Sequence, residues 1–394
     1  MKIIWLSPFP LDLLIKSGLK LIKQTNGHAC SWIINWANYI SKLDGVDLHI
    51  VTYSAKIKKN QIVKYNNYSV HVIKSSIWFS DKSWAGLFNI DAITKFFFLK
   101  NKFHQKLSTL NPDIIHAHGT EDVYSLVAAE SNYKSVISMQ GIIAEYLITN
   151  PCNRFKYTKK TEEISVKKGK YFMCRTHFDK NFVKKINSNA EIFHMPEPMN
   201  PCFFNIDRNE AQPLRIIHVG GFDPRKGLDD LFKSLKIVFM QFPNVKLDVI
   251  GSGTKIREVF LKDMAENLGI SHNISWHGYL DAEEISQIHK NAALFIITSQ
   301  NENSPNTLAE ALCSGTPSIA YNVGGISSMF EDNKSGLLVI PGNINELAEK
   351  ICLLLKDKKL REFLSNESIK ITKCNHPREV ARKSYDFYER IIND

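Results

Sequence analysis

The sequence predicts an α/β protein built from two tandem Rossmann-like, doubly wound domains that face each other across a cleft. Short apolar runs alternate with helical patterns in which apolar residues recur every three or four positions. This alternation runs through the first half of the chain, pauses near residues 195–213, and then starts again. The length of 394 residues also suits two domains better than one.

In the first half, the predicted strands are short apolar runs. The first, at residues 3–6, is followed by a long loop that contains Gly27 and by a helix whose apolar face includes Trp32, Trp36 and Ile40. Further strands are predicted at residues 48–52, 70–73, 114–117 and 135–139, and a helix rich in Phe and Lys at residues 96–110. This last helix could lie at a membrane interface, although such a pattern more often has one face in the core and solvated lysines on the other.

The second half shows the same alternation more regularly. Strands are predicted at residues 215–219, 245–250, 274–277, 294–298, 318–321 and 337–340. Helices are predicted at residues 228–242, 254–268, 281–292, 306–314, 344–356, 359–373 and 376–392. Asp281 and Glu284 have the spacing of a capping box. Alternation at this pace predicts a parallel sheet with helices on both faces.

The connection between the two halves is marked by prolines and by weak periodicity. The prolines in this stretch are Pro196, Pro198, Pro201 and Pro213. We therefore predict an N-terminal domain at residues 1–200, a linker at 201–213 and a C-terminal domain at 214–375.

Basic residues are concentrated in the first half. Residues 1–211 contain 28 Lys and Arg against 17 Asp and Glu, whereas the remainder contains 22 and 23. The segment 154–185 alone contains 11 basic and 3 acidic residues. Such an excess indicates an anionic partner, such as nucleic acid, a phosphorylated acceptor or an anionic membrane, or else a solvated surface. Since no helix-turn-helix, RRM or zinc-finger pattern accompanies it, nucleic acid is not expected.

The cysteine pattern and the first residues indicate the cellular compartment. The seven cysteines show no CxxC pair and no His-flanked spacing, so neither a structural zinc site nor a redox motif is expected. Scattered single cysteines are typical of a reducing compartment. The first apolar run is too short for a signal peptide, and no apolar stretch is long enough to span a bilayer. We expect a cytoplasmic protein or one held peripherally at the inner face of the membrane.

Residues 298–312 carry the clearest chemical pattern. They run from an apolar strand into a predicted helix, with Glu302 in the turn and Glu310 two turns further along. The free N–H groups of Asn306 and Thr307 at the helix start would form an anion site. Two carboxylates around such a site could hold the hydroxyls of a sugar nucleotide. Taken alone, the pattern would more often be a solvated turn glutamate and an ordinary helix glutamate.

Five segments, in order, resemble the motifs of retaining glycosyltransferases of family 4, the glycosyl transferases group 1, which have the GT-B fold. The pair Glu302 and Glu310 resembles the E-x7-E motif of that family. The five segments are 113–119, 219–227, 277–279, 298–312 and 315–326. The resemblance covers most of the chain and is densest over residues 215–339.

The resemblance implies roles for individual residues. Glu310 would hold the ribose hydroxyls of the donor, and Glu302 the hydroxyls of its sugar. The catalytic residues would be Glu302, Lys226, which would neutralise the diphosphate leaving group, and His118, which would face the donor sugar. Gly27 would let the backbone approach the phosphates. The full donor-binding set implied is Gly27, Gly221, Arg225, Lys226, Glu302, Ser304, Asn306, Thr307 and Glu310.

His118 ends a predicted strand, where a histidine could simply cap the strand. Its D-x-x-H-x-H context favours a role in binding or acid–base chemistry. By alternation along the strand, we expect His116 to face the core instead.

The chain departs from the family pattern at several positions. Gly221 stands where the family usually has arginine, and we expect Arg225 to supply the missing phosphate contact. Gln140 replaces a usual histidine, and the first loop has the single glycine Gly27 in place of a pair. The turn after Glu302 reads Asn-Ser-Pro-Asn where Gly-Phe-Gly is usual.

The sequence therefore predicts a retaining, metal-independent glycosyltransferase without a cofactor. It would move a sugar from a UDP- or GDP-sugar to a hydroxyl of a glycan acceptor, which we expect to be lipid-linked and used for surface polysaccharide. The donor would bind the second domain and the acceptor the first, and the resemblance implies that the last helix, at 376–394, crosses back to the first domain. Two alternatives remain: a sugar-nucleotide epimerase or phosphorylase on the same scaffold, and a non-catalytic partner subunit of another glycosyltransferase.

Overall fold

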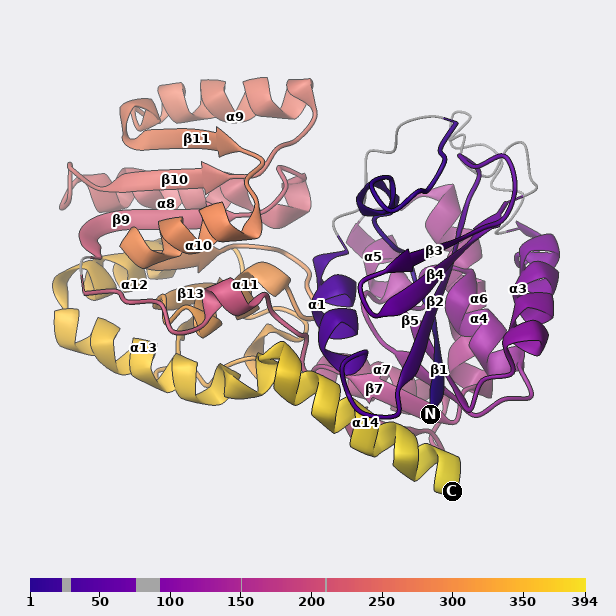
Figure 1. Ribbon diagram of the computed structural model, residues 1–394. Helices are drawn as coiled ribbons and strands as arrows, with labels where there is room; N and C mark the ends of the chain where they lie inside the picture. The colour runs from indigo at the N-terminus through magenta and orange to yellow at the C-terminus, as the bar shows by residue number, and fades with distance from the viewer. Residues whose placement is uncertain (23–29, 76–92, 150, 210) are drawn as a thin grey trace. The chain divides into compact units, whose positions relative to one another are not determined.

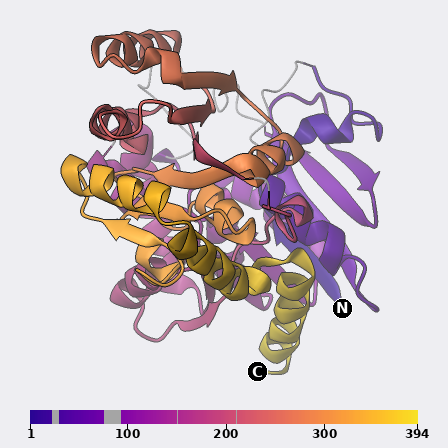
Figure 2. The ribbon, with the colours of Figure 1, turned by 90° about the vertical axis from the view of Figure 1, so that its left-hand side faces the viewer.

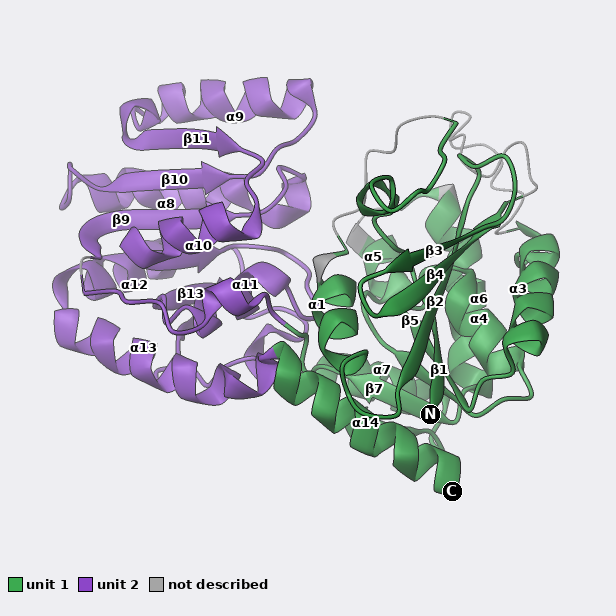
Figure 3. Cartoon of the chain, viewed as in Figure 1, with its two compact units in different colours: residues 1–198, 377–394 green, residues 199–376 purple. Residues whose placement is uncertain are grey.

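The computed structural model describes residues 1–22, 30–75, 93–149, 151–209 and 211–394. These residues form two compact units, which Figure 3 shows in different colours. Unit 1 comprises Met1–Pro198 and Pro377–Asp394, and unit 2 comprises Met199–His376. The C-terminal helix thus belongs to unit 1.

The described residues of unit 1 form an eight-stranded sheet in the order β3-β4-β2-β1-β5-β6-β7-β8 (Figure 1). Neighbouring strands are parallel except at the edge, where β3 pairs antiparallel with β4. The strands are β1 (Lys2–Leu6), β2 (Asp47–Ser54), β3 (Gln61–Tyr65), β4 (Tyr68–Lys74), β5 (Ile114–His118), β6 (Ser135–Ser138), β7 (Tyr171–Cys174) and β8 (Glu191–His194). The helices are η1 (Leu11–Leu14), α1 (Ser31–Ile40), α3 (Phe97–Leu110), α4 (Val123–Glu130), α5 (Ile143–Thr149), α6 (Asn153–Lys168), α7 (His177–Ile186) and α14 (Pro377–Asn393).

Helices cover both faces of the unit 1 sheet. On one face, Trp36 of α1 and Tyr388 of α14 share a buried core with Trp5 of β1. On the other face, Phe103 of α3 packs in a second core with Ile4 of β1. Successive residues of β1 thus point to opposite faces, as a strand buried on both sides requires.

The described residues of unit 2 form a six-stranded parallel sheet in the order β11-β10-β9-β12-β13-β14. The strands are β9 (Gln212–Val219), β10 (Lys246–Ile250), β11 (Ile274–Gly278), β12 (Ala292–Ile297), β13 (Ser318–Tyr321) and β14 (Leu337–Val339). The α-helices are α8 (Leu228–Phe239), α9 (Lys255–Asn267), α10 (Ala282–Asn291), α11 (Asn306–Cys313), α12 (Ile344–Lys356) and α13 (Lys358–Thr372). Short 3-10 helices are η2 (Pro201–Phe203), η3 (Pro224–Lys226), η4 (Ser271–Asn273), η5 (Ile326–Ser328) and η6 (Lys373–Asn375).

Helices also cover both faces of the unit 2 sheet, as Figures 1 and 2 show from two directions. Leu231 of α8 and Leu347 of α12 belong to one buried core, and Leu308 of α11 belongs to the core on the opposite face. Asp281 and Glu284 form the predicted capping box at the start of α10. The two parallel sheets, each between layers of helices, confirm the predicted pair of doubly wound domains.

Helix α6 has no counterpart among the helices predicted from the sequence, because the side of this helix that faces the core is polar. Thr158, Thr161, Glu162 and Ser165 are all buried, so apolar residues do not recur at helical spacing. Glu162 accepts hydrogen bonds from the Thr120 hydroxyl at 2.8 Å and from two backbone N–H groups of α5. A charge buried in this way needs such partners.

The segment 201–213, expected to be a linker, lies within unit 2. It contains η2, the start of β9 and Phe203, which is fully buried against Ala309 and Cys313 of α11. No helix in the described ranges is long and apolar enough to cross a bilayer.

Candidate functional site

Two loops at the carboxyl edge of the unit 2 sheet lie side by side. They follow β9 and β12, which are parallel neighbours in the sheet. The N–H of Gln300 donates to the carbonyl of Arg225 at 2.8 Å, and the Thr298 hydroxyl donates to the carbonyl of Gly227 at 2.8 Å. These hydrogen bonds fix one loop against the other.

An ion pair between Lys226 and Glu302 connects the same two loops. The Lys226 Nζ lies 2.5 Å from the Glu302 Oε1. The Glu302 side chain is 9% exposed, whereas the Lys226 side chain is 23% exposed. The carboxylate therefore holds a cation that remains open to solvent, as a group that binds an anionic ligand must be.

Two glycines allow the close approach of backbone that this arrangement needs. Gly227 has φ +70°, and a Cβ there would lie 2.0 Å from the carbonyl oxygen of Thr298. Gly324 has φ +51°, and a Cβ there would lie 1.9 Å from the carbonyl oxygen of Glu302. Since no real Cβ comes so near a backbone oxygen, any side chain at either position would push the site apart.

We expect Gly324→Ala to cost more stability than a positive φ alone explains. Gly269 is a matched control, because it has φ +73° but a Cβ added there would meet no atom within 4 Å. Gly269→Ala should cost roughly 1 kcal/mol in the free energy of unfolding, and Gly324→Ala at least ~2 kcal/mol. Urea unfolding of both variants measures the difference, and equal losses would contradict the proposed packing of Gly324 on Glu302.

The start of α11 presents N–H groups toward the same loop. Pro305 is its N-cap residue, and no described side chain caps the helix. The first N–H groups of a helix have no partner within it, so those of Asn306 and Thr307 can receive an anion. Ser304, which precedes the cap, is partly buried.

Glu310, in the middle of α11, differs from Glu302 in its surroundings. No described residue gives its carboxyl a hydrogen bond or an ion pair in the structure. Burial raises the pKa of Glu310 to about 8, and no nearby positive charge offsets the effect. A partly buried carboxyl without a partner can accept hydrogen bonds from the hydroxyl groups of a ligand.

The predicted phosphate contacts of Gly221 and Arg225 remain predictions. A Cβ at Gly221 would lie 3.7 Å from the nearest atom, so the backbone leaves room for the arginine that the family pattern has there. The Arg225 guanidinium donates to the Asn301 carbonyl at 3.2 Å. Gly27 lies outside the described residues.

His118 lies in unit 1, at the end of β5. Its ring stacks on His116 with centroids 3.9 Å apart and packs against Trp5 and Trp36. Neither ring nitrogen has a hydrogen-bond partner among the described residues. Burial, then the neighbouring His116 and Arg175, lowers the pKa of His118 well below its ordinary value, so the ring is neutral.

The expectation that His116 and His118 face opposite ways is wrong. Residues i and i+2 of a strand point to the same face, and the two rings stack. His116 is nevertheless buried, with its two nitrogens 2.5 Å from the Tyr388 hydroxyl and 2.6 Å from the Ser138 hydroxyl.

Sequence reasoning missed a charged cluster near His118. Arg175 follows β7 directly and forms an ion pair with the buried Glu197, which follows β8. Glu121 follows β5 and accepts a hydrogen bond from the Gly141 N–H at 2.6 Å. Charged residues placed just after parallel strands were the available signal, since the ends of such strands share one edge of the sheet. Within the described ranges, no group of three or more His, Cys, Asp or Glu side chains could hold a metal ion.

Comparisons with known sequences find similarity mainly in unit 2. Residues 203–371 match the sequence profile described as Glycosyl transferases group 1. An uncharacterized glycosyltransferase of Methanocaldococcus jannaschii is 28% identical over 202 residues, or 46% of this chain and 51% of that protein. The poly(glycerol-phosphate) alpha-glucosyltransferase of Bacillus subtilis is 27% identical over 215 residues, or 53% of this chain and 31% of that enzyme. The chain thus matches about half of the first relative and about a third of the second.

Comparisons with solved structures cover both units. Sucrose-phosphate synthase from Thermosynechococcus elongatus has a TM-score of 0.78 at 15% identity and covers 100% of this chain and 99% of its own. Anabaena HepE in complex with UDP has a TM-score of 0.72 at 14% identity and covers 99% of this chain and 100% of its own. The chain therefore has the GT-B fold of such glycosyltransferases.

Proposed function

We propose that the chain is a retaining glycosyltransferase that moves a sugar from a UDP- or GDP-sugar to a hydroxyl group of a glycan acceptor without a metal ion. The observation that carries the proposal is the ion pair between Lys226 and Glu302, 2.5 Å long, which joins the loops that follow β9 and β12. It combines a cation for a diphosphate with a carboxylate for sugar hydroxyls, beside free N–H groups of a helix start. The solved complex of HepE with UDP supports a donor whose nucleotide is UDP.

In this proposal, unit 2 binds the donor. Glu310 accepts hydrogen bonds from the two ribose hydroxyls, which replace the solvation that the carboxyl lacks in the free protein. Lys226 and the N–H groups of Asn306 and Thr307 bind the diphosphate, and Glu302 receives hydroxyls of the sugar. The charges at this site are in place before the donor arrives, which reduces the reorganisation that the reaction requires.

The proposed reaction exchanges one glycosidic bond for another. The bond between the anomeric carbon and the leaving phosphate oxygen breaks, and negative charge grows on that oxygen. Lys226 stabilises this growing charge more strongly than it stabilises the bound donor. This difference lowers the barrier to the reaction. The acceptor hydroxyl attacks from the same face and gives its proton to the departing phosphate oxygen. The products are a glycoside with retained configuration and a nucleoside diphosphate.

We assign the acceptor to unit 1. Because the His118 ring is neutral and has a nitrogen free on either side, it suits hydrogen bonding to a sugar hydroxyl better than proton donation. The excess of basic residues over residues 1–211 supports a lipid-linked acceptor at an anionic membrane surface. The Bacillus subtilis relative is named for glucosyl transfer to poly(glycerol phosphate), which supports a phosphate-bearing polymer as acceptor.

A panel of nucleotide sugars tests the donor. A ligand that binds only the folded state raises the melting temperature in proportion to RT ln(1 + [L]/Kd). We expect one UDP- or GDP-sugar to raise the melting temperature by several degrees at about 100 times its Kd, where the gain is ~2.7 kcal/mol. ADP- and CMP-sugars serve as controls. If no nucleotide sugar shifts the transition at millimolar concentration, the donor site is not formed by these residues.

A further inference from the structure

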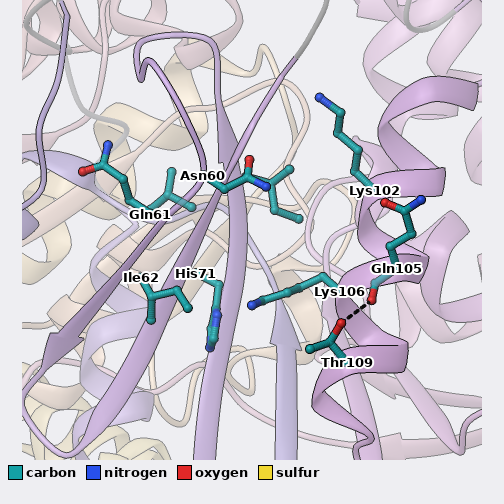
Figure 4. Close-up of a pocket in the computed structure, with 10 residues that line it drawn as sticks. Asn60, Gln61, Ile62, His71, Lys102, Gln105, Lys106 and Thr109 are labelled. Carbon is teal, nitrogen blue, oxygen red and sulfur yellow. Dashed lines mark hydrogen bonds between the residues drawn. The ribbon is translucent and has the colours of Figure 1, made fainter.

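A polar pocket in unit 1 is lined by none of the residues to which donor or acceptor roles are assigned. It has a volume of about 380 Å³ and lies between α3 and the edge strands β3 and β4. Figure 4 shows Lys106 reaching from α3 toward the strand that carries His71. The residues that line the pocket are Asn60, Gln61, Ile62, His71, Val72, Ile73, Lys102, Gln105, Lys106 and Thr109.

The pocket has positive charge without a counterion. No acidic residue is among those that line it. Lys102 and Lys106 lie one helical turn apart on α3. The Lys102 Nζ donates to the carbonyl of Lys74 at 2.8 Å, and Lys106 has no hydrogen bond or ion pair with any described residue. Burial lowers the pKa of both lysines, which means that each ammonium group would gain from an anionic partner.

His71 adds a buried hydrogen-bonding atom with no partner. The residue is 4% exposed, and its Nδ1 has no hydrogen-bond partner in the described structure. Its Nε2 lies 2.9 Å from the Nδ1 of His49, whose Nε2 lies 3.2 Å from a carboxylate oxygen of Asp47. An unpaired polar atom at such depth costs free energy unless a ligand or water satisfies it.

The contacts from Asp47 through His49 to His71 determine whether the Nδ1 of His71 is a hydrogen-bond donor or acceptor. The Asp47 carboxylate can only accept, so the proton of a neutral His49 lies on Nε2. The Nδ1 of His49 then accepts from His71, which leaves the Nδ1 of His71 as an acceptor. Burial, together with the charge of Lys106, lowers the pKa of His71 to about 3, so its ring is neutral. The pocket thus offers ammonium donors and one acceptor.

We propose that this pocket binds a phosphate monoester, carried either by a small soluble molecule or by a lipid headgroup. The singly protonated form of the phosphate, which is populated near its second pKa of about 6, has oxygens for Lys102 and Lys106 and a hydroxyl for the Nδ1 of His71. A carboxylate or a sulfate has no such hydroxyl near neutral pH, and a phosphate diester has none either. The proposal does not depend on the glycosyltransferase activity, and its failure would leave that activity untouched.

Hydrogen–deuterium exchange on the full chain locates the binding, since phosphate could also reach Lys226 in unit 2. At about pH 6, where a phosphate monoester keeps one proton in a large share of its molecules, inorganic phosphate and glycerol 3-phosphate should slow exchange in the peptides of β4 and α3. Lys106→Gln should weaken this effect about 10- to 100-fold in ligand concentration, as expected for one lost charge-assisted contact. Lys106→Arg should largely retain it. Lys185→Gln, which removes an exposed lysine of α7, is the control for net charge and should bind like the unaltered chain.

Two comparisons complete the test. Sulfate at equal ionic strength should protect these peptides at least about tenfold less well, because it lacks the hydroxyl for His71. Vesicles with phosphatidic acid, a monoester, separate the two sources: protection by vesicles but not by glycerol 3-phosphate assigns a headgroup, and the reverse assigns a soluble ligand. No protection by any phosphate monoester, equal protection by sulfate, or equal binding by Lys106→Gln would overturn the proposal.

Discussion

Lys226→Gln is expected to reduce sugar transfer by about 10²–10³-fold, because the variant loses the cation that stabilises the leaving diphosphate. Most of the loss should fall on kcat, since the charge on the phosphate oxygen grows only as the glycosidic bond breaks. The variant also leaves Glu302 without its partner, at a cost of roughly 1–3 kcal/mol in stability. Circular dichroism and thermal unfolding check that the chain still folds, and a transfer assay measures the rate.

Lys236→Gln is the matched control for this variant. Lys236 is an exposed lysine of α8, and its loss changes the net charge by the same amount. Its transfer rate should stay within about twofold, because exposed charges away from the site contribute little. Full activity in Lys226→Gln would remove Lys226 from the proposed mechanism. A second variant, Glu302→Gln, keeps the cation but removes both the ion pair and the carboxylate assigned to the sugar hydroxyls, so it reports on those two roles together.

Glu310→Gln is expected to weaken donor binding about 10-fold or more while stabilising the free protein at alkaline pH. The pKa of Glu310 is raised from 4.5 to about 8 in the folded chain, so ionisation costs folding free energy as the pH rises from about 4.5 to 8. Glutamine does not titrate and avoids that cost. At pH 9 the variant should be more stable than the unaltered chain by roughly 1–3 kcal/mol. This range is smaller than the free energy that corresponds to the whole pKa shift, because the side chain is partly exposed and solvent weakens the effect. At pH 4, where the glutamate is protonated, the two chains should be about equal.

Donor binding gives the second readout for Glu310. Ribose hydroxyls favour the ionised carboxyl, so binding of a nucleotide sugar should release a proton and tighten between about pH 6.5 and 8. The Glu310→Gln variant should bind about 10-fold or more weakly with no such pH dependence. Glu266→Gln, an exposed glutamate of α9, is the control. A wild-type stability that does not fall relative to Glu310→Gln as the pH rises from about 4.5 to 8 would contradict the partly buried, unpaired state of this carboxyl.

The sequence predicts unit 2 in more detail than unit 1, and packing explains the difference. The helices of unit 2 bury apolar stripes, as α8 and α12 do, so their periodicity is visible in the sequence. In unit 1, α6 buries Glu162 and hydroxyl side chains, which no hydrophobic pattern reveals. The edge strand β3 pairs antiparallel and has a mostly exposed outer side, so its short pattern was too weak to predict.

The residues of the site could be named from motifs, but their interactions could not. Lys226 and Glu302 are 76 positions apart in sequence, and only the adjacency of β9 and β12 brings them to 2.5 Å. The unpaired state of Glu310 depends on what surrounds α11, which no local pattern contains. Arg175 belongs to no motif of the resemblance, and its place after β7 is apparent only once the sheet is known.

The anomeric configuration of the product tests the central claim most directly. The purified chain, supplied with the nucleotide sugar that stabilises it and with a matching acceptor, should form a glycoside, and proton NMR of the initial product gives its configuration. We predict the same anomeric configuration as in the donor, formed by the unaltered chain and lost in Lys226→Gln. An inverted product would contradict the retaining mechanism, and no product from any nucleotide sugar would contradict the assignment of this chain as a glycosyltransferase.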